Sequence, residues 1–286
     1  MNARMLCALA LLSWACSGQE AASGNHEAAP APATPAAASD SLPAAILGTA
    51  PPPRGEPILY IEGDSATTGY IVAPEGDGPF PAVILVHEWD GLGDRVRQVA
   101  DAFADEGYVA LAADMFQGRT GSSPAENRAL TQEARSDPAR MVANLDAAAR
   151  TLRARPDVSG RIAAMGWCFG GGVALSYGIG GERHEGTAIF YGQLVTDPEQ
   201  LARLHHPVYG TFAAEDQGIP PDEVARFVEA LRGAGLENDV HVYDGVGHGF
   251  WLYVDEDPAA RTAPAADAWR RLLSYLDRAL RPSAGS

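Results

Sequence analysis

The feature that most constrains the fold is an alternation of short strand-like and longer helix-like segments along residues 54–280. The run PAVILVH at residues 81–87 is apolar throughout, as expected for a strand that is buried on both faces. Apolar residues then recur at helical spacing between Val96 and Ala104, and a second apolar run occupies residues 109–114. This alternation predicts the α/β class, with a mostly parallel sheet and helices on both faces.

The same alternation continues to the end of the chain. Asp137 before Pro138 is typical of a helix start, because aspartate caps the first turn and proline fits its first position. Two opening strands are expected to form an antiparallel edge. The expected strands lie at residues 58–61, 69–72, 161–167, 187–191, 208–213 and 240–243, and the expected helices at 137–155, 169–177, 221–232 and 265–280. This series predicts one domain over residues 54–286.

The first 53 residues have a different composition. Residues 5–14 are an apolar run, too brief for the about 20 residues that span a bilayer, after a short positive region at residues 1–4. We expect residues 1–16 to be a signal peptide, in which Cys16 resembles a bacterial lipidation site. Ordinary secretion by nearby cleavage and a retained N-terminus are the alternatives. Residues 17–53, rich in Ala, Pro and Ser, predict a disordered tether, so we expect an exported protein of the periplasm or cell envelope.

Composition excludes several classes of function. A formal net charge of −16 argues against nucleic acid as a partner, because phosphate binding requires clustered basic side chains. All 21 basic residues are arginine, which excludes Schiff-base lysines and the P-loop lysine. No HExxH motif, Cys/His cluster or GxGxxG motif occurs, so we expect neither a metal nor a diffusible cofactor. We expect a monomer that binds a small molecule, with possible membrane attachment through a lipidated Cys16.

The cysteine count isolates one thiol. Of the three cysteines, Cys7 and Cys16 lie in the expected signal, so Cys168 is the only thiol of the expected mature domain. The surroundings of an exported protein oxidise free thiols, so such proteins seldom keep a lone free cysteine that has no function. A buried, inert core cysteine is one alternative. A redox-sensing thiol is another, although the mature domain offers no resolving cysteine.

The strongest local signal is the hexapeptide GWCFGG at residues 166–171, which follows an expected strand and opens an expected helix. This is the context of a nucleophile elbow, with cysteine as the nucleophile. Gly166 and Gly170 give the sharp turn its room, and the helix N-terminus favours the thiolate of Cys168. The N–H of Phe169 would face a developing oxyanion. A glycine-rich turn with a chance cysteine is the alternative.

Two downstream motifs follow in the order nucleophile, acid, histidine that α/β-hydrolases require. Residues 214–220 (AEDQGIP) follow an expected strand and offer Asp216, and the glycine-flanked His248 follows the last strand. His248 would take the proton of the cysteine, and Asp216 would orient and stabilise the imidazole. Glu215 and Asp244 are rival orienting acids.

A further motif, HEWDGL at residues 87–92, ends the first long strand. The loop at this place in the fold supplies a second oxyanion N–H, here expected from Trp89. Glu88 is expected beside the site, and a solvated loop charge is the alternative.

The ordered set HEWDGL, GWCFGG, AAEDQGIP and GVGHGF resembles the dienelactone hydrolase family of α/β-hydrolases over about residues 58–280. The resemblance implies hydrolysis of ester or lactone bonds through a thiol acyl-enzyme that water then cleaves. It implies that Glu88 contacts the resting Cys168 and that substrate displaces it. It also implies that Tyr191 lines the pocket.

The sequence departs from the family in one respect. Members that act on dienelactone hold its carboxylate with two arginines; Arg119 matches the first at a stretched spacing, and none follows His248 before Arg261. The aromatic residues 250–251 indicate a more apolar pocket. The candidate substrate-binding residues are Arg119, Tyr191 and Trp251.

The sequence therefore predicts a hydrolase of small esters or lactones. A thioester-cleaving or acyl-transfer enzyme that uses the same residues is one alternative. A non-catalytic cell-envelope binding lipoprotein that retains the fold is another, and the retention of every expected catalytic residue type disfavours it.

Overall fold

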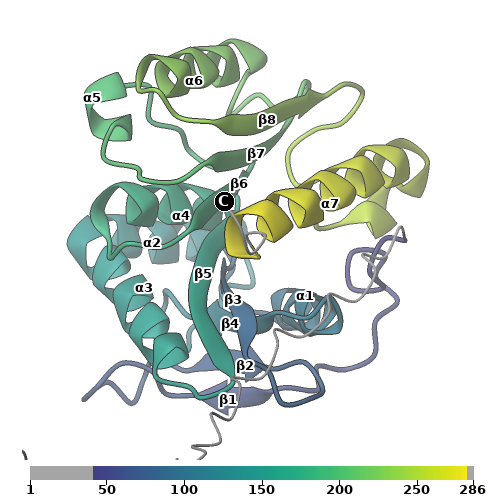
Figure 1. Cartoon of the computed structure of the whole chain (residues 1–286). Helices are drawn as coiled ribbons and strands as arrows, with labels where there is room; N and C mark the ends of the chain where they lie inside the picture. The colour runs from purple at the N-terminus through teal and green to yellow at the C-terminus, as the bar shows by residue number, and fades with distance from the viewer. Residues whose placement is uncertain (1–40, 282–286) are drawn as a thin grey trace, which may run out of the picture. The chain divides into compact units, whose positions relative to one another are not determined.

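Eight strands form one sheet in the computed structural model, which describes residues 41–281 (Figure 1). Their order along the sheet is β1-β2-β4-β3-β5-β6-β7-β8. The strands are β1 (Glu56–Ile58), β2 (Gly69–Val72), β3 (Phe80–Val86), β4 (Val109–Ala113), β5 (Val158–Trp167), β6 (Gly186–Phe190), β7 (Val208–Ala213) and β8 (Asn238–Tyr243).

Strand direction divides the sheet into a short edge and a long parallel part. β1 and β2 pair antiparallel, and β2 pairs antiparallel with β4. All neighbouring pairs from β4 and β3 through β7 and β8 are parallel. The expected antiparallel edge and mostly parallel sheet are thereby confirmed. Because parallel strands end at the same edge, the loops after β3, β5, β7 and β8 meet there.

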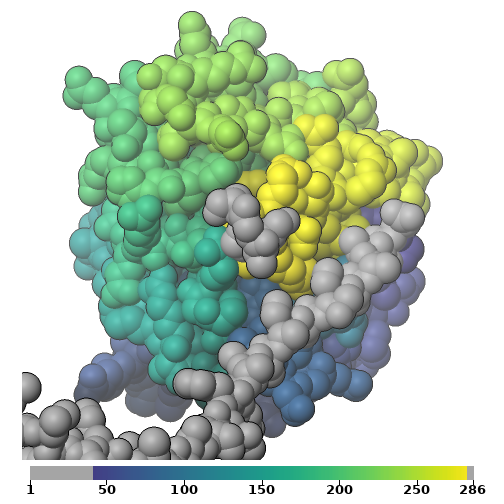
Figure 2. Space-filling model, in the orientation of Figure 1, coloured from purple at the N-terminus to yellow at the C-terminus, as the bar shows by residue number. Residues whose placement is uncertain are grey.

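The helices cover both faces of this sheet. α1 and α7 pack on one face, and α3, α4 and α6 lie on the other (Figure 1). Figure 2 shows α7 as a continuous ridge on its face. The helices are α1 (Asp94–Asp105), α2 (Pro124–Arg135), α3 (Pro138–Arg153), α4 (Phe169–Gly180), α5 (Pro198–Leu201), α6 (Pro221–Gly233) and α7 (Pro258–Leu280), with a 3₁₀ turn η1 (Val254–Glu256).

Burial on both faces explains the apolar runs of the central strands. All seven residues of β3 are buried. Along β5, Met165 and Trp167 pack with the α1 and α7 side, whereas Ile162 and Ala164 pack with the α3 and α4 side. Successive side chains point to opposite faces of a strand, so a strand between two helical layers needs apolar residues at every position.

Helix starts follow the capping rules. Asp137 accepts a hydrogen bond from the N–H of Arg140 at 3.0 Å, as expected at the start of α3. α2 was not expected from the sequence, although Ser123 caps it by accepting from the N–H of Glu126 at 3.3 Å. Few of its side chains reach the core, so its apolar pattern is weak.

The N-terminal boundary of the domain was predicted wrongly. Residues 41–53 were expected to belong to a disordered tether, but the structure packs residues 44–50, here called the N-terminal strap, against α1 and η1. Ile46 is fully buried, and its carbonyl accepts the N–H of Val254 at 3.3 Å. Side chains of α1 bind further carbonyls of this segment. The buried side chains of Ala45 and Ile46 and several backbone hydrogen bonds thus order this stretch, which stands at the end of the Ala- and Pro-rich segment.

The expected signal peptide, the lipidation site at Cys16 and residues 17–40 of the expected tether lie outside the described residues. Within residues 41–281, no helix has the length and apolar character that crossing a membrane requires.

Candidate active site

Cys168 lies on the turn between β5 and α4 in an unusual backbone conformation. Its φ of 53° and ψ of −114° fall in a region that costs about 1–3 kcal/mol for a residue with a side chain. The turn is held because the N–H of Cys168 donates to the carbonyl of Phe190 at 3.0 Å. A Cβ added to Gly170 would lie 2.3 Å from the carbonyl oxygen of Val86, so only glycine lets α4 begin this close to β3.

Asp216 and His248 meet beyond the carboxyl ends of β7 and β8. His248 Nδ1 lies 2.6 Å from Asp216 Oδ2, and Asp216 Oδ1 accepts the N–H groups of Gly218 at 2.8 Å and Ile219 at 3.2 Å. Burial alone would raise the pKa of Asp216, but the hydrogen bonds from His248 and the two N–H groups hold it below its ordinary value. Asp216 is therefore ionised and fixed in direction at neutral pH.

A hydrogen bond also joins His248 to Cys168. Because Nδ1 of the imidazole faces Asp216, this bond uses Nε2. Burial lowers the pKa of His248, but the hydrogen bonds to Asp216 and Cys168, together with the negative charge of both, raise it to about 10. The three side chains therefore form a continuous hydrogen-bonded chain.

Glu88 lies near these groups, in the loop that follows β3. It is buried, with only 6% of its surface exposed. Burial and the negative charges of Asp90 and Glu256 raise the pKa of Glu88 to about 7, although a hydrogen bond from Tyr253 and the charge of His248 lower it. Near neutral pH, Glu88 is therefore divided between its protonated and ionised forms.

His87 fixes the backbone at Glu88. The N–H of Met115 donates to His87 Nε2 at 3.1 Å, so Nδ1 carries the proton and donates to the carbonyl of Glu88 at 2.6 Å. Burial lowers the pKa of His87, which keeps the ring neutral. This ring ties the end of β3 to the end of β4, a role that sequence analysis missed although the His-Glu pair stands after the apolar run.

Cys168, Asp216 and His248 occur along the chain in the order nucleophile, acid, histidine that α/β-hydrolases require. The model of the dienelactone hydrolase family matches residues 67–280. The chain belongs to this family.

Relatives of this dienelactone hydrolase family member support the assignment. A protein of Methylorubrum extorquens named "Putative carboxymethylenebutenolidase" is 31% identical over 226 residues, which cover 74% of this chain and 77% of the relative. The Escherichia coli protein of that name is 27% identical over 227 residues, or 75% of this chain and 83% of the relative. The crystal structure of a "Putative Dienelactone Hydrolase" from Klebsiella pneumoniae is 26% identical, has a TM-score of 0.68, and is matched over 79% of this chain and 98% of its own. The fold is that of an α/β-hydrolase, and the protein is a hydrolase of the dienelactone hydrolase type, as predicted.

The two expected oxyanion donors belong to neighbouring segments of the dienelactone hydrolase fold. A Cβ on Gly170 would lie 2.5 Å from the carbonyl oxygen of His87, so the start of α4 lies against the end of β3. The N–H of Phe169 is the first of α4 and points out of the helix N-terminus, where no earlier turn accepts it. Trp89 lies on the loop beyond β3, with 36% of its surface exposed.

The three candidate substrate-binding residues, Arg119, Tyr191 and Trp251, lie in different surroundings. The ring of Tyr191 lies 4.9 Å from that of His248, and its residue is fully buried. Arg119 is held by Glu133, which accepts from its two terminal nitrogens at 2.9 and 2.5 Å. Trp251 is fully buried and stacks on Trp167 at 5.7 Å. Tyr191 and Trp251 are equally enclosed, and the part of all three residues in substrate binding stays a prediction.

Sequence analysis also missed Tyr253 and Arg95. Tyr253 donates to Glu88, and Arg95 lies with its guanidinium carbon 5.3 Å from the centroid of the Tyr253 ring. Neither residue belongs to a motif, and the half-buried Arg95 lies outside the apolar stripe of α1, so local sequence carries no signal for this contact.

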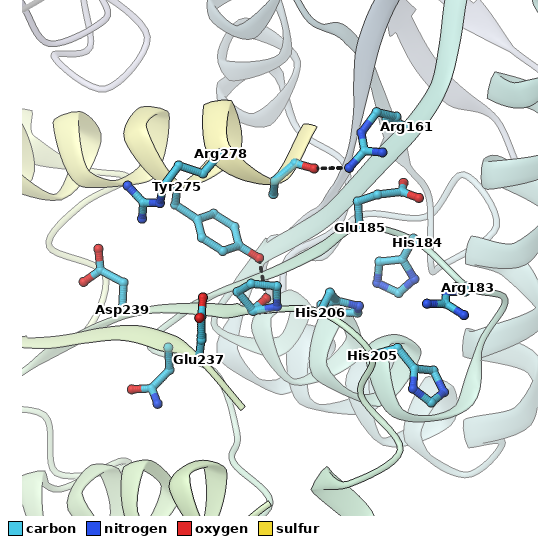
Figure 3. Close-up of a pocket in the computed structure, with 13 residues that line it drawn as sticks. Arg161, Arg183, His184, Glu185, His205, His206, Glu237, Asp239, Tyr275 and Arg278 are labelled. Atoms are coloured by element: carbon cyan, nitrogen blue, oxygen red, sulfur yellow. Dashed lines mark hydrogen bonds between the residues drawn. The ribbon is translucent and has the colours of Figure 1, made fainter. Parts of the chain in front are cut away.

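A polar pocket lies at the amino ends of β6, β7 and β8, the sheet edge opposite Cys168 (Figure 3). Thr187 Oγ1 lies 3.3 Å from Nε2 of His184 and 2.8 Å from Nε2 of His206, both buried. Acidic and basic groups line it together: Arg161, Arg183, Arg278, Glu185, Glu237 and Asp239. Among residues 41–281, no three His, Cys, Asp or Glu side chains are grouped closely enough to hold a metal ion.

Proposed function

We propose that this hydrolase cleaves small carboxylic esters or lactones with Cys168 as nucleophile, His248 as the proton carrier and Asp216 as its orienting acid. The observation that carries the proposal is the continuous hydrogen-bonded chain from Asp216 through His248 to Cys168. The thiol stands at a helix N-terminus on a strained turn, which exposes the nucleophile and favours its ionised form.

In the first half-reaction the sulfur of Cys168 attacks the carbonyl carbon, and a C–S bond forms as the carbonyl oxygen becomes an oxyanion. The N–H groups of Phe169 and Trp89 stabilise this charge. When the intermediate collapses, the C–O bond to the leaving group breaks, and the imidazolium of His248 gives its proton to the departing alkoxide. A thioester on Cys168 and a neutral His248 remain.

In the second half-reaction water attacks the thioester. Neutral His248 takes a proton from the water as the new C–O bond forms, and the C–S bond then breaks to release the carboxylic acid and the thiolate. Asp216 stabilises the imidazolium in both halves because its charge lies 2.6 Å from Nδ1. The cycle ends with the imidazolium–thiolate pair restored.

The charge around the site favours neutral substrates. The guanidinium of Arg119 is engaged by Glu133, and Arg261 is engaged by the carbonyl of Tyr253 and by Glu256. Glu88 adds a carboxyl group beside the thiol-bearing turn. A substrate with its own carboxylate would meet this acid and two arginines that already have partners, so a neutral ester or lactone fits better.

The proposed place of action is the cell envelope. The apolar run at residues 5–14 and the Cys16 sequence context support export with lipid attachment. Radiolabelled palmitate incorporation into the full chain, but not into Cys16→Ser, would test the attachment.

Hydrolysis of p-nitrophenyl acetate by the full chain tests the chemistry. We expect Cys168→Ala to lower turnover at least about a thousandfold, because the nucleophile is lost. We expect mass spectrometry of wild type to find an acetyl group on Cys168. Ser176→Ala is the matched control, since Ser176 lies on α4 and bonds only the carbonyl of Gly172; its turnover should equal that of wild type.

Two results would contradict this mechanism. Full turnover in a folded Cys168→Ala variant would exclude the cysteine nucleophile. An acetyl group found on another residue at the rate of turnover would assign the nucleophile elsewhere.

A further inference from the structure

Tyr253 connects the loop after His248 to Glu88. Its hydroxyl donates a hydrogen bond to the Glu88 carboxylate, while its backbone N–H donates to the carbonyl of Gly249 at 3.4 Å. The side chain therefore spans from the loop that carries the histidine to the loop that follows β3. A neutral donor at this place orients the carboxylate without cancelling its charge.

Arg95 holds Tyr253 in position from α1. Its guanidinium lies over the Tyr253 ring at 5.3 Å, a distance that allows cation–π attraction. The same guanidinium donates to the carbonyl of Leu252 at 3.4 Å and to Asp255 Oδ2 at 2.8 Å. Arg95 thus binds the chain on both sides of Tyr253, at Leu252 and at Asp255. With Asp255 it forms an ion pair.

The N-terminal strap closes this arrangement from the outside. Arg95 donates to the carbonyls of Ala45 at 2.7 Å and Ile46 at 3.3 Å. Gly48 has a φ of 71°, and a Cβ there would lie 2.5 Å from Asp255, so the strap approaches η1 as closely as a glycine permits. The strap therefore binds one terminal nitrogen of Arg95 and helps to keep its guanidinium against the tyrosine.

The remaining charged groups around Glu88 act in known directions. Burial raises its pKa first, Asp90 and Glu256 raise it further, and His248 lowers it. Tyr191 is affected in turn, because burial and the charge of Glu88 raise its own pKa. Among these neighbours in the described chain, the Tyr253 hydroxyl is the one that offers the Glu88 carboxylate a side-chain hydrogen bond.

We propose that Tyr253 is a positioning residue that holds the Glu88 carboxyl group beside the catalytic chain, and that Arg95 and the N-terminal strap hold Tyr253. The strap is then part of the active-site support rather than a spacer. This inference rests on the proposed function in one respect, that Glu88 acts on the reaction of Cys168. The contacts from Ile46 through Arg95 to Tyr253 stand independently of it.

The first test is the dependence of kcat/KM on pH for p-nitrophenyl acetate, with the full chain. The inflection that Glu88→Gln removes is assigned to Glu88. We expect Tyr253→Phe to move this inflection upward by about one pH unit, because the carboxylate loses one hydrogen bond to its charged form. An unmoved inflection in Tyr253→Phe would overturn the positioning role.

A second readout does not require ester turnover. The rate at which iodoacetamide alkylates Cys168 is measured against pH by peptide mass spectrometry, which separates it from Cys7 and Cys16. We expect the same upward shift in Tyr253→Phe. If wild type hydrolyses no ester but the alkylation profile shifts, the proposed function fails and this inference stands. If turnover is normal and neither profile shifts, the inference fails alone.

The strap is tested through its bridge. We expect Arg95→Leu to shift the inflection in the same direction as Tyr253→Phe, and Arg95→Lys to shift it also, because lysine keeps the charge but not the planar set of donors. Arg97→Leu is the matched control, since Arg97 lies on the same helix and its guanidinium bonds Asp94. A shift in Tyr253→Phe with none in either Arg95 variant would overturn the part assigned to the strap, and so would an equal shift in Arg97→Leu.

Discussion

At the scale of single residues, the proposed chemistry depends on the hydrogen bond between Asp216 and His248. The carboxylate accepts one bond from the imidazole and two from backbone N–H groups, which fixes both its charge and its direction. Together with Cys168, it raises the pKa of His248 to about 10 against the effect of burial. The imidazole therefore keeps its proton at neutral pH, as the proposed mechanism requires.

We expect Asp216→Asn to lower kcat/KM by about 10³- to 10⁴-fold, by analogy with other triads in which the acid is neutralised. The pKa of His248 should fall from about 10 towards its ordinary value, so the remaining activity should depend on pH near neutrality. Turnover measured from pH 5 to 10 checks this. Asp244→Asn is the control, because Asp244 is exposed; a comparable loss there would reassign the orienting acid.

The contacts at the site could be predicted only in part. The motif around Cys168 and the order of Asp216 and His248 depend on local sequence, because glycine spacing and strand ends determine where these residues stand. The state of Glu88 could not be predicted, since its pKa depends on burial, on the hydrogen bond from Tyr253 and on the charges of Asp90 and Glu256. Such surroundings arise only when distant loops meet.

Among the elements, the N-terminal strap is the one whose composition misled prediction most. It stands at the end of the Ala- and Pro-rich segment 17–53, whose composition resembles a linker, yet Ala45 and Ile46 are buried to 2% and 0% exposure. The central strands were predictable for the opposite reason, because residues buried on both faces leave an unbroken apolar run. α2 was not predicted because Leu130 and Ala134 are its only buried apolar residues, so its sequence shows little apolar periodicity.

We expect Ile46→Ala to lower the free energy of unfolding by about 2–4 kcal/mol, the usual cost of removing a large buried aliphatic group. Thr49→Ala, at an exposed position of the same strap, should change it by less than about 0.5 kcal/mol. Urea unfolding of the full chain, followed by tryptophan fluorescence, measures both. Equal and small effects of the two changes would show that the strap is not packed in solution.

Across the whole molecule, the two edges of the sheet carry histidines of opposite character. Burial lowers the pKa of His184 to about 4 and that of His206 to about 3 (Figure 3). In the unfolded chain both titrate near about 6.5. Between that pH and about 4 the unfolded state binds more protons, so the free energy of unfolding falls as the pH falls. The raised pKa of His248 acts in the other direction, and its contribution is present below about 6.5 and lost as the pH rises through about 10.

We expect His184 and His206 each to lower the free energy of unfolding by at most about 2 kcal/mol between pH 7.5 and pH 5, while the raised pKa values of His248 and Glu88 act in the opposite direction. In His184→Gln the free energy of unfolding at pH 5, relative to pH 7.5, should therefore be higher than in wild type, because glutamine does not titrate. Urea unfolding at the two pH values measures this difference. His205→Gln changes the exposed neighbour and should match wild type; a His184→Gln variant that also matches wild type would show that His184 does not contribute.

The hydrogen bond between Ile46 and Val254 has a consequence for how the enzyme comes into being. The elbow at Cys168 is translated well before His248 and the loop that the strap closes. By the proposed mechanism, a nascent chain, or a proteolytic fragment cut before β8, has the proposed nucleophile without its base or its support, and we expect it to hydrolyse no ester. Hydrolytic activity is then expected only once both ends of the described chain have met, so the rate of a preparation should follow the fraction of its molecules that have finished folding.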